Sequence, residues 1–234
     1  MILLAPSILA ADPVNLEAGV RRMEEAGCDW IHVDVMDAHF VPNLAFSPAV
    51  VKRLKQVTRL PLDVHLMMDH PETLLDAFLE AGADGITIHV EIGGAAPVNP
   101  VSALLRKIRA RGAKAGLALK PATPLSAALP FLPEADLVLC MTVEPGFGGQ
   151  TLNETVLEKI QALRNTGYRG HIEADGGVRE DNLKRLTDRG LTVAVMGTAL
   201  FGSPNPAETV ARLRNVGTGS LTCAAESNER KSKL

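Results

Sequence analysis

The chain has 234 residues, of which 46% are hydrophobic and 22% are charged, and this composition indicates one ordinary folded domain and excludes disordered and fibrous proteins. Its formal net charge of -3 gives a nucleic acid or an anionic membrane no electrostatic attraction, so neither is expected as a partner. The three widely spaced cysteines, Cys28, Cys140 and Cys223, predict no disulfide framework and favour a cytoplasmic location.

The first residues lack the basic leader of a signal peptide, and no apolar run approaches the roughly 18 residues of a membrane span, so we expect neither export nor a membrane anchor. Beyond them, helical patterns begin at a polar residue followed by proline and end at a glycine. Apolar residues recur between these signals at helical spacing. The expected starts are Asp12-Pro13, Ser47-Pro48, His70-Pro71, Asn99-Pro100, Thr123-Pro124 and Asn205-Pro206, and the expected ends are Gly27, Gly82, Gly112, Gly167 and Gly190.

Short runs rich in aliphatic and β-branched residues lie between these helices and predict eight buried strands. The alternation of eight strands with helices predicts an α/β fold, a single-domain (β/α)8 TIM barrel over residues 1–216. A doubly wound open sheet is the main alternative, but no Gly-x-Gly-x-x-Gly follows the first strand. Residues 217–234 are polar and are expected to form a flexible tail. The predicted strands are residues 3–8, 30–35, 62–66, 84–90, 113–119, 136–141, 169–174 and 191–196.

Polar residues alternate with aliphatic ones in three predicted strands, so the period of two places them on the inward face. The three inward pairs are His32 with Asp34, Asp63 with His65, and Glu173 with Asp175. Any one of them alone is more simply a satisfied buried polar group. Two imidazoles and two carboxylates that converge on one barrel mouth, however, match a site for a divalent metal of the Zn, Fe, Mn or Co kind. We therefore favour a metal or acid–base site.

Glycine-rich turns follow the last three predicted strands. They are residues 144–150, Gly176-Gly177 and Gly197-Thr198. Backbone amides in such loops bind phosphate, and (β/α)8 enzymes commonly place a phosphate at the seventh and eighth loops. Each could be an ordinary turn, but three on consecutive strands favour a phosphate site.

Several other residues near the strand ends have more than one interpretation. Ser7 either contacts a substrate hydroxyl or caps a turn, and for His89 and Glu91 a structural or supporting role is favoured over metal ligation. Three methionines either fill the core or cover a reactive intermediate from water. They are Met36, Met67 and Met141.

Five motifs together resemble the ribulose-phosphate 3-epimerase family over roughly residues 3–215. They are residues 5–9, 32–43, 63–67, 141–150 and 173–177. The resemblance implies a metal-dependent isomerase of pentose phosphate metabolism that interconverts D-ribulose 5-phosphate and D-xylulose 5-phosphate, with one divalent metal ion per subunit. It further implies a small sugar phosphate as partner and a homo-oligomeric assembly.

The resemblance also implies roles for individual positions. The implied metal ligands are His32, Asp34, His65 and Asp175, of which Asp34 and Asp175 are the acid–base pair. Ser7, His65 and Asp175 are implied to contact substrate. The implied phosphate-binding residues are Gly146, Phe147, Gly148, Gly149, Gly176, Gly177, Gly197 and Thr198.

Four positions depart from the common pattern of the family and leave the implied ligands unchanged. They are Ala38, Ser47, Ala174 and Thr198. Related epimerases act on hexulose phosphates such as allulose 6-phosphate, which is the alternative substrate class.

Epimerisation at C3 explains why two carboxylates are needed. Inversion next to a carbonyl removes a proton from one face and returns one to the other, so two acid–base groups must flank the substrate. Asp34 and Asp175 can do this, and a metal can stabilise the enediolate that forms between the two steps. Asp37 falls beyond the strand on the opposite parity, and we expect it to shape the loop through His39 and Asn43 without touching a metal.

Two other functions compete with the epimerase. Lys120 at the end of the fifth predicted strand could form a Schiff base, as in barrel aldolases, if burial lowered its pKa. The other alternative is a non-catalytic barrel that binds sugar phosphates through its glycine loops while the carboxylates are structural.

Overall fold

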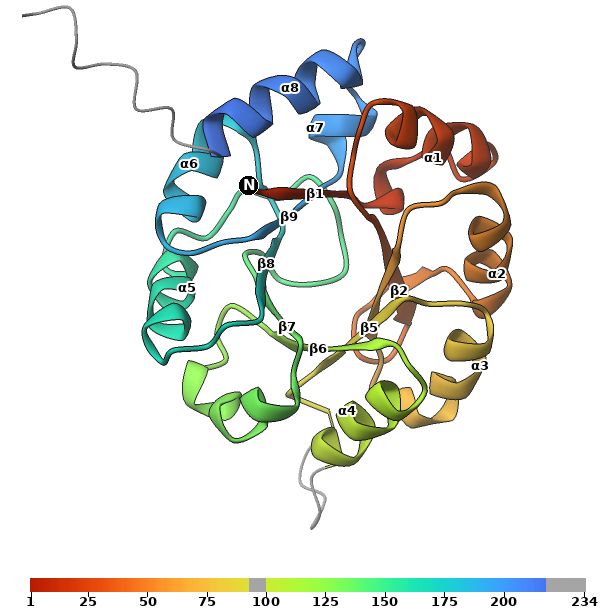
Figure 1. Cartoon of the computed structure of the whole chain (residues 1–234). Helices are drawn as coiled ribbons and strands as arrows, with labels where there is room; N and C mark the ends of the chain where they lie inside the picture. The colour runs from red at the N-terminus through yellow and green to blue at the C-terminus, as the bar shows by residue number, and fades with distance from the viewer. Residues whose placement is uncertain (93–99, 218–234) are drawn as a thin grey trace, which may run out of the picture.

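The computed structural model describes residues 1–92 and 100–217, and Figure 1 shows them as a ring of strands surrounded by helices. Of the predicted tail, residues 217–234, all but Gly217 lie outside the described residues. No helix within the described ranges is long and apolar enough to cross a membrane.

Eight parallel strands form the ring, in the order β1-β9-β8-β7-β6-β5-β4-β2. A parallel bridge between Ser7 and His32 joins the end of β1 to β2, so the sheet closes on itself. The predicted (β/α)8 barrel is confirmed, and the open-sheet alternative is wrong. The strands are β1 (Leu3–Pro6), β2 (Ile31–Asp37), β4 (Leu62–Met67), β5 (Gly85–His89), β6 (Lys114–Leu119), β7 (Leu137–Met141), β8 (His171–Asp175) and β9 (Val193–Met196).

A short additional strand, β3 (Leu44–Ala45), pairs antiparallel with the last two residues of β2. The sequence analysis does not predict it, because two residues carry no periodicity to detect. It folds the loop after β2 back over the carboxyl end of the barrel.

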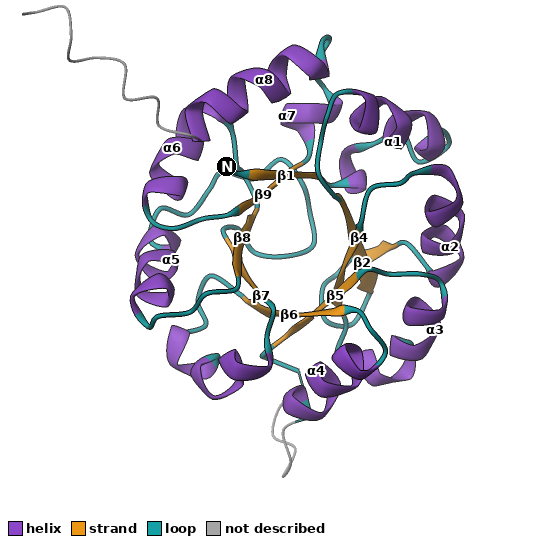
Figure 2. Cartoon of the chain, viewed as in Figure 1, coloured by secondary structure: helices purple, strands orange, loops and turns teal. Residues whose placement is uncertain are grey.

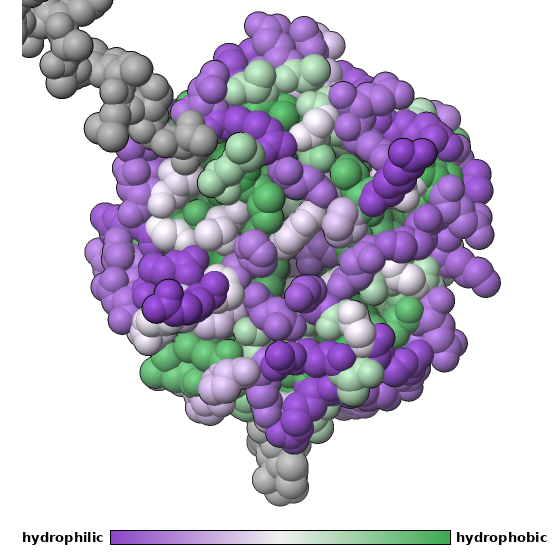
Figure 3. All heavy atoms as spheres, in the orientation of Figure 1, coloured by the Kyte–Doolittle hydropathy of each residue, from purple (hydrophilic) through white to green (hydrophobic). Residues whose placement is uncertain are grey.

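Helices cover the outside of the ring, as Figure 2 shows. On the face seen in Figure 3, hydrophilic side chains cover most of the rim and apolar residues show only in scattered patches. The α-helices are α1 (Leu16–Glu25), α2 (Pro48–Val57), α3 (Leu75–Glu80), α4 (Val101–Ala110), α5 (Val156–Asn165), α6 (Glu180–Asp188), α7 (Thr198–Phe201) and α8 (Pro206–Gly217). Two 3-10 helices, η1 (Ile8–Ala10) and η2 (Pro71–Thr73), follow β1 and β4.

One predicted helix differs in kind. The segment that begins at Thr123-Pro124 forms two consecutive 3-10 helices, η3 (Leu125–Ala127) and η4 (Leu129–Glu134). Pro130 and Pro133 lack the amide hydrogens that an α-helix would need there, so the tighter and shorter turns replace it.

The alternation in β2 separates the core from the site. Ile31 and Val33 are fully buried among the aliphatic residues that pack under the helices, while His32 and Asp34 have the opposite parity and face into the barrel. The parallel register of β2 and β4 pairs His32 with Asp63, and Asp34 with His65. The backbone register alone therefore makes the predicted pairs of β2 and β4 neighbours.

Candidate active site

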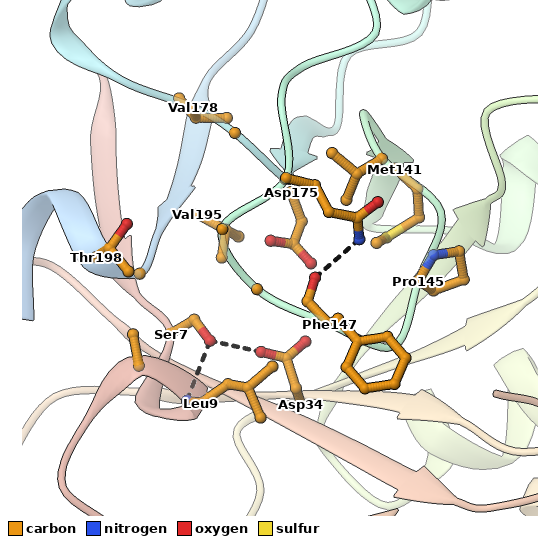
Figure 4. Close-up of a pocket in the computed structure, with 18 of the residues that line it drawn as sticks. Ser7, Leu9, Asp34, Met141, Pro145, Phe147, Asp175, Val178, Val195 and Thr198 are labelled. Carbon is orange, nitrogen blue, oxygen red and sulfur yellow. Dashed lines mark hydrogen bonds between the residues drawn. The ribbon is translucent and has the colours of Figure 1, made fainter. Parts of the chain in front are cut away.

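A pocket of about 190 Å³ opens at the carboxyl ends of the strands (Figure 4). Asp34 and Asp175 lie in it close together, with Ser7 beside Asp34. The loops after β7, β8 and β9 form its remaining wall. The predicted residues that line it are Ser7, Asp34, Met36, Met67, Met141, Gly146, Phe147, Gly148, Gly149, Asp175, Gly176, Gly177, Gly197 and Thr198.

Four side chains under this pocket come close enough to share one metal ion. His32, Asp34, His65 and Asp175 each offer a ligand atom, and these atoms all lie within 4.8 Å of one another. Asp34 Oδ1 lies 3.3 Å from His32 Nε2 and 3.4 Å from His65 Nδ1. The structure thus brings together all four residues that the resemblance implies as ligands.

The surroundings of His32 fit a metal ligand. Its Nδ1 lies 2.7 Å from Asp63 Oδ2, and a carboxylate oxygen accepts, so this nitrogen donates. The other nitrogen, Nε2, is buried and has no hydrogen-bond partner among the described residues. Burial opposes the charge on His32, but Asp34 and Asp63 outweigh it and raise the pKa of the imidazole. A mixed set of imidazole and carboxylate donors around such an atom is what a divalent transition metal prefers.

His65 is held from the other side. Its Nε2 lies 2.8 Å from His89 Nε2, and His89 Nδ1 lies 3.0 Å from Glu91 Oε2. Burial lowers the pKa of His65, and lowers that of His89 to about 4, so both imidazoles are neutral near pH 7. The sequence analysis gave His89 and Glu91 a supporting role, and neither belongs to the clusters of metal-binding groups among the described residues.

The two pocket carboxylates have opposite electrostatic surroundings. Burial opposes ionisation of Asp34, but His32 favours it, and the pKa of Asp34 is lowered. The Ser7 hydroxyl donates to Asp34 Oδ2 at 2.5 Å. Burial and the charge of Asp34 raise the pKa of Asp175 to about 7. In the metal-free protein one carboxylate is therefore ionised while the other holds a proton into the neutral range.

A second buried carboxyl, Glu173, lies behind this site. It is fully buried, and neither of its oxygens has a hydrogen-bond partner among the described residues. Burial and the charge of Asp63 raise the pKa of Glu173 well above its usual range, so it is neutral. His32 Nδ1, 3.7 Å from Glu173 Oε1, faces both carboxyls. The sequence analysis recognised Glu173 as inward but gave it no role.

The glycine loops pack together on one side of the pocket. A Cβ at Gly176 would lie 2.3 Å from Val143 Cγ2, and one at Gly177 would lie 2.5 Å from the backbone nitrogen of Leu152. Both glycines have positive φ angles of 115° and 63°. Glycine is therefore required where the loops after β7 and β8 meet, and the same loops can bring backbone amides to a phosphate.

Ser7 caps the turn at the start of η1, one of the two roles considered for it, and it also contacts Asp34. Its oxygen accepts from the Leu9 amide at 3.3 Å and its hydroxyl donates to Asp34. Met36, Met67 and Met141 line the pocket while almost fully buried. They form an apolar wall beside the carboxylates.

Asp37 shapes the loop after β2 as expected, but it is the last residue of β2 and does not lie beyond the strand. Its carboxylate accepts from the backbone amides of His39, Phe40 and Asp69, and among the described residues it is not part of any group that could hold a metal ion. Asn43 acts differently from the expectation, since its side-chain amide donates to Gly146 O and ties this loop to the loop after β7. The backbone spacing of two loops far apart in sequence determines this bond, and no local pattern signals it.

The position of Lys120 bears on the alternative function of a Schiff-base lyase. The ammonium of Lys120 lies 3.8 Å from the centre of the Phe40 ring, and Lys120 is not among the residues that line the pocket, which disfavours a Schiff-base lyase.

Arg179, which was not singled out from the sequence, lines the pocket after Gly177. Ala38, one of the four departures from the common pattern of the family, has a φ angle of 62°, a conformation in which glycine alone is free of strain.

Known proteins are similar in sequence to this chain over nearly its whole length. Residues 3–201 match the ribulose-phosphate 3 epimerase family. The chain is 45% identical to a ribulose-phosphate 3-epimerase of Mycobacterium tuberculosis over 224 residues, which are 94% of this chain and 95% of that protein. It is 44% identical to that of a Synechocystis species over 218 residues, 92% of this chain and 94% of that protein.

Solved structures share the fold at much lower identity. The 3-hexulose-6-phosphate synthase of Salmonella typhimurium superposes with a TM-score of 0.66 at 16% identity, covering 93% of this chain and 99% of that one. The thiamine phosphate pyrophosphorylase of Pyrococcus furiosus superposes with a TM-score of 0.63 at 19% identity, covering 93% and 95%. At these identities the likeness concerns the barrel alone.

Proposed function

The chain belongs to the ribulose-phosphate 3-epimerase family, and we propose that it inverts C3 of a pentulose phosphate with two carboxylates at one divalent metal site. It is an isomerase that acts on carbohydrates, with the activity of a ribulose-phosphate 3-epimerase. The proposed reaction interconverts D-ribulose 5-phosphate and D-xylulose 5-phosphate.

The observation that carries the mechanism is the contrast between Asp34 and Asp175. The two carboxyls share one pocket, but the pKa of Asp34 is lowered and that of Asp175 is raised to about 7. They come from β2 and β8, and β1 and β9 lie between these strands in the ring. A substrate carbon bound between them meets a carboxyl group on each side.

In one direction Asp34 removes the proton at C3 and Asp175 delivers a proton to the opposite face. In the reverse direction the two residues exchange these roles. Removal of the C3 proton leaves one negative charge, carried mainly by O2 of the enediolate, next to the O3 hydroxyl. A divalent cation of the Zn, Fe, Mn or Co kind supplies Lewis-acid stabilisation of that charge when it is held by His32, Asp34, His65 and Asp175.

The remaining pocket residues bind and shield the substrate in this proposal. The loops that carry Gly146 to Gly149, Gly176-Gly177 and Gly197-Thr198 hold the phosphate through backbone amides. Ser7 and His65 contact the sugar, and the methionine wall keeps water from the enediolate. Allulose 6-phosphate remains the alternative substrate, and the cytoplasmic location, the homo-oligomer and the division into a barrel of residues 1–216 and a tail remain predictions.

Replacing either carboxylate by its amide tests this proposal. We expect Asp34→Asn and Asp175→Asn each to lower kcat/KM by at least about 100-fold, because each removes one proton-transfer group. The exposed Asp188, which pairs with Lys184 on α6, supplies the matched control Asp188→Asn, expected to behave as wild type. Metal content is measured on each variant, so that loss of the ion is distinguished from loss of the base. A variant of Asp34 or Asp175 that keeps its metal and the wild-type rate would sink the two-base proposal.

A further inference from the structure

We propose that Glu91, acting through His89, holds His65 in the tautomer whose Nδ1 is free to bind the metal ion. This inference rests on the metal site proposed above and adds two positioning residues to it. It stands on the direction of two consecutive hydrogen bonds, His65 to His89 and His89 to Glu91, that lead from β4 to the loop after β5.

The direction is set at Glu91, because a carboxylate accepts hydrogen bonds and does not donate them. Its Oε1 accepts from the Lys120 amide at 2.8 Å and from the Thr123 hydroxyl. These donors and the His89 contact lower the pKa of Glu91 to about 2, so it is ionised. Its Oε2 lies 3.0 Å from His89 Nδ1, and this nitrogen must therefore carry the hydrogen.

The same logic passes through the two imidazoles. A neutral imidazole has one N–H, so His89 Nε2 carries a lone pair and accepts. The nitrogen it faces at 2.8 Å is His65 Nε2, which must donate. The 2.8 Å contact requires a hydrogen between the two nitrogens, whereas the contact of His65 Nδ1 with Asp34 Oδ1 is longer, at 3.4 Å, so the single hydrogen of His65 is on Nε2. Its Nδ1 then presents a lone pair to the metal cluster.

Because both imidazoles are buried, these hydrogen bonds determine which tautomer His65 adopts. His65 and His89 are both fully buried, and the Phe40 ring packs 4.5 Å from the His89 ring. In water the two tautomers of an imidazole interconvert freely, whereas here the hydrogen on the wrong nitrogen of His65 would point at the ion. His32 is oriented by the same principle but directly, through Asp63. Each histidine of the site is thus backed by a carboxylate, and His89 extends the reach of Glu91.

The variant Glu91→Gln reverses the direction of the hydrogen bonds from Glu91 through His89 to His65, a series called the relay below, and replaces the carboxylate with an amide of nearly the same size. The amide oxygen stays at the Oε1 position, because the Lys120 amide and the Thr123 hydroxyl both donate there. The amide NH2 then faces His89 Nδ1 and donates to it. His89 must carry its hydrogen on Nε2, and His65 is driven to the tautomer with the hydrogen on Nδ1, where it meets Asp34.

Two measurements test the proposal, and the first needs no metal. Long-range proton–nitrogen NMR spectra of the histidine rings in metal-stripped protein identify which nitrogen carries the hydrogen. We expect His65 to be protonated on Nε2 in the wild type and on Nδ1 in Glu91→Gln. The second is titration with Co²⁺ followed by its visible absorption, where Glu91→Gln should weaken binding about 10- to 100-fold.

The matched control is Thr87→Val. Thr87 lies on the same strand as His89, is equally buried, and lines a different cavity together with Asp63 and Gly85. It should leave both the His65 tautomer and the Co²⁺ affinity unchanged. Glu91→Asp, which keeps the carboxylate, should restore part of the affinity.

Hydrogen on Nδ1 of wild-type His65 would overturn the relay, and this spectrum does not depend on any variant folding. Glu91→Gln that keeps both the wild-type tautomer and the wild-type affinity would overturn it as well. Failure of the proposed function would give a different result. His32→Ala would then bind Co²⁺ as tightly as the wild type, while the wild-type His65 tautomer would still be the expected one.

Discussion

At the scale of single residues, the chemistry depends on giving two aspartates different surroundings. Asp34 accepts a hydrogen bond from the Ser7 hydroxyl and faces His32, which favours its ionised form. Asp175 has a carboxylate as its principal charged neighbour, and its pKa rises to about 7. In the metal-free protein two residues of one type thus have different protonation states.

This contrast predicts that metal binding depends on pH. In the metal-free protein the raised pKa of about 7 leaves a proton on Asp175 below that pH, and an ion must displace it. Co²⁺ affinity should therefore fall as the pH falls through 7, and binding at about pH 6 should release at least one proton. Calorimetry in two buffers of different ionisation enthalpy counts the protons released. Affinity that is unchanged between about pH 6 and about pH 8 would show that Asp175 is already ionised.

At the scale of elements, the loops after β7 and β8 act as one unit because glycine lets them touch. Gly177 has a positive φ angle, and the space for its Cβ is filled by the backbone nitrogen of Leu152 at 2.5 Å and by the carbonyl of Gln150 at 2.8 Å. Backbone cannot yield as a flexible side chain can. The Asn43 bond to Gly146 O adds the loop after β2 to the same assembly.

The substitution Gly177→Ala should therefore cost more than a backbone conformation alone. Gly27 has a φ angle of 85° with nothing within 4 Å of its Cβ position, so Gly27→Ala measures the conformational cost by itself. We expect Gly177→Ala to lower the free energy of unfolding by about 1–3 kcal/mol more than Gly27→Ala does, because a methyl group is forced into packed backbone. Urea unfolding of both variants measures the difference, and equal losses would mean that the two loops do not constrain each other.

At the scale of the whole molecule, closure of the sheet makes the site. The four candidate metal-binding residues come from β2, β4 and β8, and only a closed ring brings β8 back toward β2. The sequence predicts this well, because buried parallel strands read as aliphatic runs and an inward His or Asp interrupts them with a period of two. His32, Asp34, His65 and Asp175 are all visible in this way.

What could not be predicted are the contacts between segments that no local pattern joins. The bond from His65 to His89 needs the register of β4 against β5, and the role of Glu91 needs the loop beyond that register. The replacement of an expected helix by η3 and η4 follows from two prolines that the helical spacing alone does not weigh. Periodicity predicts which face a side chain takes, whereas its partner depends on the packed structure.

The central claim is that one carboxylate removes the C3 proton and a different one returns a proton. Its most direct measurement is the isotopic content of C3 early in the wild-type reaction in D2O, starting from D-ribulose 5-phosphate. With two bases the hydrogen removed is not the hydrogen returned, so the early product carries deuterium at C3 while unreacted substrate keeps protium. Product that retains the substrate's own hydrogen would mean that a single group carries the proton between faces, and would contradict the roles assigned to Asp34 and Asp175.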